Sequence, residues 1–119
     1  MVTPNPDFVY KIATHAAYRV FVKSGTFPGM PIDINDGYVH FSIAEQLAET
    51  LRLHFAGQDN LVVFSVRTSD VGTALRWEPS RGGQLFPHLY GELPISAVGR
   101  HATISVAADG SVTLPVWVR

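Results

Sequence analysis

Two stretches of the chain repeat apolar residues at the three- and four-residue spacing of an α-helix. The first runs from His15 to Ser24, with Thr14 as a suitable N-cap and Gly25 as a typical helix end. The second begins at Ser42 and places four apolar side chains on one face, namely Ile43, Leu47, Leu51 and Phe55. Two helices are therefore expected, each with an apolar face toward a core.

The second helix also carries a recognisable start and end. In Ser42-Ile43-Ala44-Glu45 the serine can cap a backbone amide while the glutamate reaches back, which is the capping-box pattern. Gly57 would end the helix. Between the two helices, the polar stretch from Thr26 to Gly37 is rich in proline, glycine and aspartate, so it is expected to be a loop.

Strands are predicted where apolar residues run between turn residues. Phe8 to Ala13 is the first, Tyr38 to Phe41 is a short second, and the apolar run from Leu61 to Val66 is expected to be a central strand. The later candidates are Leu75 to Glu78, Leu85 to Leu93, Arg100 to Val106 and Ser111 to Val118. Because Asp109-Gly110 lies between the last two, a C-terminal hairpin is expected.

This order of elements predicts an α+β fold with two main helices and a curved, split and mostly antiparallel sheet. The length of 119 residues is that of one domain, so residues 1–119 are interpreted as a single domain.

Composition narrows the possible functions. Nine basic against ten acidic side chains leave a net charge of −1, which argues against a polybasic surface for duplex nucleic acid or a membrane. The absence of cysteine excludes disulfides, thiolate metal sites and cysteine nucleophiles. The longest apolar run is too short to span a bilayer and the N-terminus lacks a signal pattern, so a cytoplasmic protein is expected.

Residues 36–42 offer the first candidate chemistry. His40 lies at a predicted strand end, just before the helix that Ser42 opens, where free backbone amides favour an anion such as a phosphate. His40 would donate to that anion or act as a general acid or base. The alternatives are a partly buried histidine bonded to backbone and a serine that only caps its helix.

Two later segments add aromatic and acidic groups. Glu78 beside Trp77 suggests acid–base chemistry or a bond to a ligand hydroxyl, although an exposed glutamate next to a core tryptophan is the simpler interpretation. On one extended face, Phe86, His88 and Tyr90 would form either a wall for a planar ring such as nicotinamide or adenine, or a core face. No metal site is predicted, because no closely spaced histidine pair occurs.

Several motifs occur together over roughly residues 8 to 98. They are Tyr10-Lys11-Ile12, Gly25 to Phe27, Asp36 to Ser42 with Gln46, Arg76-Trp77-Glu78 and Phe86 to Gly91. In combination they resemble the family known as domain of unknown function 952, for which no activity is established.

A more distant resemblance concerns the centre of the chain. Tyr38 to Val66 is similar to the middle of the RNA 2′-phosphotransferases, and Leu89 to Val98 to their closing strand. Those enzymes have the ADP-ribosyltransferase-like fold, so the resemblance implies a cleft that holds NAD or an ADP-ribose-like group. By this resemblance His40 would contact the ribose or phosphate and Ser42 would support the site. The Arg-His pair on their first strand is replaced here by Tyr10-Lys11-Ile12.

The expected function is therefore binding of NAD, ADP-ribose or a related nucleotide, with transfer or hydrolysis of an ADP-ribosyl or ribose-linked phosphate group. The candidate catalytic residues are His40, His88 and Glu78. The candidate ligand contacts are Tyr10, Lys11, Ser42, Trp77, Phe86 and Tyr90. The alternatives are a non-catalytic nucleotide-binding module and a domain that binds a protein partner through exposed aromatic side chains.

Overall fold

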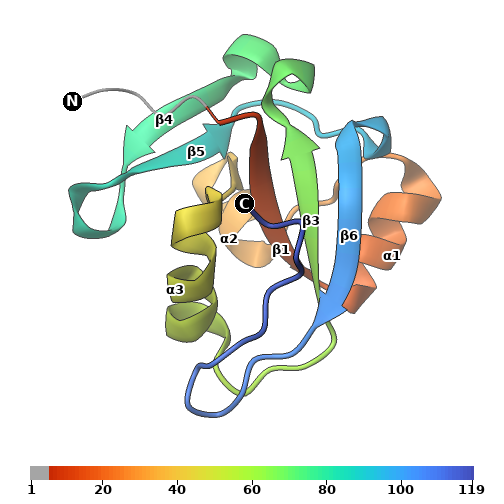
Figure 1. The fold of residues 1–119 in the computed structure, drawn as a ribbon. Helices are drawn as coiled ribbons and strands as arrows, with labels where there is room; N and C mark the ends of the chain where they lie inside the picture. The colour runs from red at the N-terminus through yellow and green to blue at the C-terminus, as the bar shows by residue number, and fades with distance from the viewer. Residues whose placement is uncertain (1–5) are drawn as a thin grey trace.

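The computed structural model describes residues 6–119, which form two three-stranded antiparallel sheets and several helices (Figure 1). One sheet has the order β1 (Phe8–Thr14), β3 (Leu61–Arg67), β6 (Val98–Ile104), and the other has the order β2 (Val39–His40), β5 (Leu85–Leu89), β4 (Leu75–Pro79). The α-helices are α1 (His15–Ser24), α2 (Pro31–Asp36) and α3 (Ala44–Phe55). The predicted α+β class is confirmed. No helix within residues 6–119 has the length and apolar character needed to cross a membrane.

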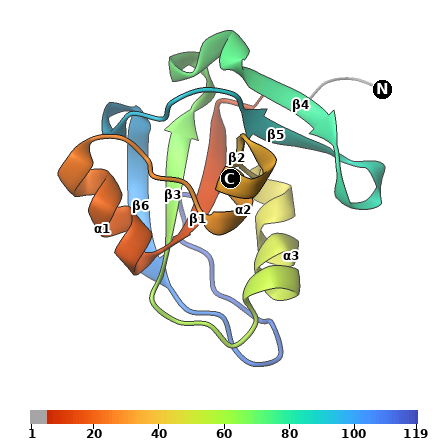
Figure 2. The same cartoon turned by 180° about the vertical axis from the view of Figure 1, so that it is seen from behind.

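The β1–β3–β6 sheet has the longer strands and is called the larger sheet below; the β2–β5–β4 sheet is the smaller one. Strand β3 is the central strand of the larger sheet, and side chains on both of its faces are buried. Val62, Phe64 and Val66 belong to the core cluster that α1 covers (Figure 2). Leu61 and Val63 belong to a second cluster, under α3 and the C-terminal segment (Figure 1). The prediction of a central strand is therefore confirmed, and the alternation along it separates two cores.

The first helix has the predicted bounds. The Thr14 hydroxyl accepts a hydrogen bond from the Ala17 N–H at 3.1 Å, which caps the helix. Gly25 follows the last helical residue with φ of 85°, the left-handed conformation typical of a helix end.

The two sheets meet where Tyr10 and Ser42 pair. The Tyr10 N–H donates to the Ser42 carbonyl at 2.8 Å, and the Ser42 N–H donates to the Tyr10 carbonyl at 2.9 Å. This pairing holds Ser42 in extended backbone, so the predicted capping box of Ser42 and Glu45 is wrong. Helix α3 begins two residues later, and the Gln46 side chain accepts from the Ile43 N–H at 3.1 Å.

The predicted loop from Thr26 to Gly37 contains an unpredicted helix, α2. Pro31 occupies its first position, where the fixed φ of proline suits a helix start and the missing N–H costs no bond. The Asp33 carboxylate accepts from the Met30 N–H at 2.7 Å. Gly37, with φ of 84°, ends the helix after two turns at most. Pro31 and Gly37, which are typical turn residues, are thus the two ends of a short helix.

The predicted C-terminal hairpin is also wrong, although its turn is present. The Gly110 N–H donates to the Ala107 carbonyl and the Ala107 N–H donates to the Ser111 carbonyl, both at 2.9 Å. Residues 111–119 do not pair with β6; their apolar side chains pack over the β1–β3 sheet instead (Figure 1). Burial of that open sheet face outweighs the pairing that the turn favours.

Strand bounds differ from the predictions at several ends. The strand predicted from Leu85 to Leu93 ends at Leu89, because its partner β4 begins at Leu75 and the next facing residue, Ala74, belongs to a 3₁₀ turn. Strand β6 begins at Val98 rather than Arg100.

Replacement of Gly110 by alanine is expected to destabilise the fold by more than about 2 kcal/mol. Gly110 has φ of +88°, and a Cβ there would overlap Cγ of Arg52 and lie 3.3 Å from its Cα. The matched control is Gly25→Ala, since Gly25 has φ of +85° and no atom within 4 Å of the added Cβ. Urea unfolding measures both variants, and equal losses would show that Arg52 does not constrain the turn.

Candidate functional site

A cleft of about 770 Å³ opens between α2, α3, the smaller sheet and the edge of β1. Most of the surface of its wall is apolar, with histidine, hydroxyl and charged side chains among the hydrophobic ones. This size and character are typical of sites for small organic ligands. Tyr10 and Ser42 both line it, so the cleft lies at the bridge between the two sheets.

The structure brings six of the nine predicted site residues to this cleft, namely Tyr10, Lys11, His40, Ser42, Phe86 and His88. Glu78 and Tyr90 do not line it and lie behind the His88 ring. Trp77 packs against the core cluster that contains Leu75 and Leu89, so the structure does not place it at the cleft.

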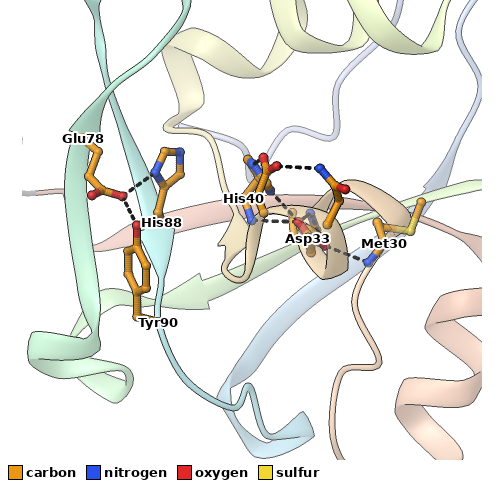
Figure 3. A network of polar contacts seen from close by, with 9 residues as sticks. Met30, Asp33, His40, Glu78, His88 and Tyr90 are labelled. Atoms are coloured by element: carbon orange, nitrogen blue, oxygen red, sulfur yellow. Dashed lines mark hydrogen bonds and ion pairs between the residues drawn. The ribbon is translucent and has the colours of Figure 1, made fainter.

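Asp33 is a buried carboxylate that connects three segments beside the cleft (Figure 3). Its oxygens accept hydrogen bonds from Lys11 Nζ at 2.9 Å, the Met30 N–H at 2.7 Å and the His40 N–H at 3.0 Å. Nδ1 of the His40 ring lies 2.7 Å from Oδ1 of Asp33. All these groups can donate, so the buried charge is fully hydrogen-bonded.

These bonds set the charge state of Asp33. Burial alone would raise the pKa of Asp33, but the His40 hydrogen bonds and the charge of Lys11 outweigh burial and lower it from 3.8 to about 2. The resulting stabilisation is present above about pH 3.8 and is lost as the pH falls toward 2. Burial lowers the pKa of Lys11 more than Asp33 raises it. The Lys11 side chain lines the cleft, but its amine donates to Asp33.

The His40 ring lies between two carboxylates. Nδ1 faces Asp33, and Nε2 lies 2.9 Å from Oδ2 of Asp36. Each ring nitrogen of His40 therefore faces a carboxylate oxygen, which can only accept a hydrogen bond. The Asp36 side chain is 32% exposed, so it can turn toward solvent and leave Nε2 to a ligand.

His88 has a different environment. Its Nδ1 lies 2.8 Å from Oε1 of Glu78, and the same oxygen accepts from the Tyr90 hydroxyl at 2.7 Å (Figure 3). The bonds from Tyr90 and His88 lower the pKa of Glu78, so Glu78 is an acceptor and Nδ1 carries the proton. Burial lowers the pKa of His88 more than Glu78 raises it. A neutral ring with an unshared pair on Nε2 is therefore favoured at neutral pH.

The two histidines are neighbours because β2 and β5 pair them in register. Their ring centroids are 5.3 Å apart. Tyr38 covers both rings, with centroid distances of 4.6 Å to His40 and 4.3 Å to His88. Tyr90 also contacts Tyr38, at 5.0 Å, instead of continuing the wall formed by Phe86 and His88.

Sequence reasoning missed Asp33, Asp36, Tyr38 and Arg81 as residues of the site. Asp33 and Asp36 lie in the stretch predicted to be a loop, where aspartate is a common turn residue. Asp36 and Tyr38 adjoin His40 in the motif from Asp36 to Ser42, which was the available signal. Within residues 6–119, no three histidine or carboxylate side chains are arranged to hold a metal ion.

Asp33→Asn is expected to destabilise the protein by about 3 kcal/mol or more, because Lys11 would remain buried without its counter-charge. Adding Lys11→Met should recover a large part of the loss, since the amine is then absent. Urea unfolding of the single and double variants measures both effects, with the exposed Asp59→Asn as control. A double variant no more stable than Asp33→Asn would contradict this account of the ion pair.

Comparison with known proteins places the chain in a family. The family model described as "Protein of unknown function (DUF952)" matches residues 12–101. The X-ray crystal structure of protein CC0527 from Caulobacter crescentus is 42% identical, with a TM-score of 0.84 over 89% of this chain and 93% of that one. The solution NMR structure of CC0527 gives a TM-score of 0.78 at 42% identity, over 90% and 91% of the two chains. A search of curated proteins found no match.

The family match covers most of the chain, and it includes the cleft-lining histidines and both carboxylates that orient them. The resemblance noted in the sequence motifs is thereby confirmed at the level of the family. The chain belongs to the DUF952 family.

Proposed function

We propose that the cleft binds a nucleotide of the NAD or ADP-ribose class. In this proposal His88 and His40 act as base and acid in the transfer or hydrolysis of a ribose-linked phosphate or ADP-ribosyl group. The observation that carries the proposal is the pairing of His40 with His88 in the cleft wall, with ring centroids 5.3 Å apart and each Nδ1 beside a carboxylate. The similarity of Tyr38 to Val66 to the RNA 2′-phosphotransferases supports the ligand class and an ADP-ribosyltransferase-like fold.

The environments of the two rings favour different roles. His88 is neutral at Nε2 and suits a general base, with Glu78 fixing its tautomer. His40, bonded to two carboxylates, suits a general acid once Asp36 gives way to the ligand. A base and an acid side by side are the requirement for a reaction that takes one proton and gives another.

Hydrolysis of a ribose-linked phosphate shows how the two histidines would exchange protons with the reactants. His88 Nε2 removes a proton from water as the water oxygen bonds to phosphorus. The bond between phosphorus and the ribose oxygen breaks, and His40 gives its proton to that oxygen. The products are a ribose hydroxyl and free phosphate, and proton exchange with solvent restores the two rings. In a transfer reaction, an acceptor hydroxyl takes the place of water.

A second candidate is binding of the nucleotide without chemistry. Asp36 at 2.9 Å from His40 Nε2 favours it, because that nitrogen is already occupied. The absence of the first-strand Arg-His pair points the same way. A protein-binding surface is less favoured, since Phe86 lines a concave cleft and does not stand on a convex face.

His88→Ala is expected to lower turnover by about 10²-fold or more while ligand binding persists, because a general base contributes about that much. His40→Ala should lose both turnover and binding but retain the fold. Phosphorus NMR of mixtures with NAD, ADP-ribose and a 2′-phosphorylated dinucleotide measures turnover, and amide shifts measure binding. The exposed His15→Ala serves as the control. Binding by the wild-type protein with no product from any of the three compounds would favour the non-catalytic alternative.

The proposal also predicts a pH profile. Activity of the wild-type protein should fall on the acid side below pH 6.5, the ordinary histidine pKa, because burial holds the pKa of His88 below that value. Glu78 raises the pKa of His88, so Glu78→Gln should lower that pKa further and move the acid limb to lower pH. The exposed Glu92→Gln is the control. An acid limb unmoved by Glu78→Gln would exclude His88 as the base.

A further inference from the structure

We propose that Arg81 forms an anion-binding subsite in the cleft and selects ligands with a phosphate group separate from the reacting bond. The position of the reacting bond rests on the proposed function, whereas the anion subsite rests on Arg81 and its own neighbours. The subsite points to a nucleoside diphosphate sugar, such as ADP-ribose, rather than a nucleoside or a mononucleotide.

Arg81 is held in the cleft wall by two contacts. It belongs to the 3₁₀ turn Arg81–Gly83 that joins β4 to β5. Its guanidinium carbon lies 4.9 Å from the Phe86 ring centroid, and Nη1 donates to the Thr50 hydroxyl at 3.2 Å. Thr50 and Phe86 both line the cleft. The plane of the guanidinium is therefore set before a ligand arrives, which reduces the entropy lost on binding.

The donors of Arg81 are largely available. A guanidinium has about five N–H donors, and the Thr50 bond takes one of them. Within residues 6–119, no carboxylate forms an ion pair with Arg81. Glu49 is the carboxylate whose pKa responds to the charge of Arg81, and it pairs with Arg52. The remaining N–H groups of Arg81 favour an anion in the cleft. Two oxygens of one phosphate can accept from two adjacent N–H groups of a guanidinium.

The turn that carries Arg81 is fastened to α3. The buried Gln46 side chain donates to the Leu85 carbonyl at 2.9 Å and to Gln84 Oε1 at 3.4 Å. The Ser80 N–H and the Gln84 carbonyl close the turn at 2.9 Å. Ser80, the residue before Arg81, also lines the cleft, and its hydroxyl can donate. The subsite is thus a fixed part of the wall.

The spacing along β5 defines the ligand. Phe86 and His88 are two residues apart on one face of the strand, so they are separated by about 7 Å. A phosphate on Arg81, above Phe86, therefore lies about 7 Å or more from a bond that reacts at His88. A ribose at the histidine pair with a diphosphate at Arg81 satisfies this spacing. The rim of the cleft carries the exposed apolar side chains of Ile32 and Leu53, which suit a planar base.

The test is calorimetric titration of ADP-ribose into the wild-type protein, Arg81→Gln and Arg67→Gln. Arg67 is the matched control, because its guanidinium lies 4.9 Å from the Phe8 ring, as Arg81 does from Phe86, but outside the cleft. Arg81→Gln should weaken ADP-ribose binding at least about tenfold, and Arg67→Gln should leave it unchanged. Arg81→Lys should fall between, since lysine keeps the charge but not the fork.

Titration of inorganic pyrophosphate, followed by amide shifts, tests the subsite without the rest of the ligand. Shifts at residues 80–83 that vanish in Arg81→Gln would support it. Thermal unfolding of each variant separates loss of fold from loss of binding, and Arg81→Lys replaces any variant that does not fold.

The outcomes separate this inference from the proposed function. Binding that depends on Arg81 without any turnover supports the subsite and overturns the acid–base role of the histidines. Turnover that His88→Ala abolishes, with ADP-ribose binding equal in Arg81→Gln and wild type, overturns the subsite alone. Absence of binding of both ADP-ribose and pyrophosphate to the wild-type protein overturns both.

Discussion

The burial of the Asp33 carboxylate is the constraint on which the site depends. A buried charge is tolerated only where its oxygens are hydrogen-bonded, and the donors here come from three separate segments. Lys11 belongs to the larger sheet, Met30 precedes α2, and His40 belongs to the smaller sheet. One side chain therefore fixes where α2 begins, how β2 lies against β1 and where the His40 ring points.

The second histidine obeys the same principle with less burial. Glu78 is on an edge strand and holds His88 from the side away from the cleft, supported by the Tyr90 hydroxyl. The register of β2 against β5 then brings the two oriented rings together. The chemistry that we propose follows from the different surroundings of the two rings. The His40 ring lies between two carboxylates, and the buried His88 ring lies beside one.

Local pattern predicted the elements well where local forces decide them. The helix from His15 to Ser24, the central strand and the shared face of Phe86 and His88 all follow from periodicity and neighbouring residues. The errors arose where a distant partner decides. Ser42 caps no helix because Tyr10 pairs with its backbone, and Asp33 lies in a helix with its carboxylate bonded to Lys11 of β1. Neither partner is visible from spacing along the chain.

The contact between Tyr10 and the C-terminal segment has a consequence for spectroscopy. The Tyr10 hydroxyl donates to the Arg119 carbonyl at 3.0 Å, and its ring lies 6.3 Å from the Trp117 ring. Tyr10 is also part of the cleft wall. An indole thus stands one aromatic ring away from the site, while the other tryptophan, Trp77, packs against the core. Because Trp117 contacts a residue of the cleft wall, its fluorescence is the natural optical signal with which to look for a ligand in the cleft.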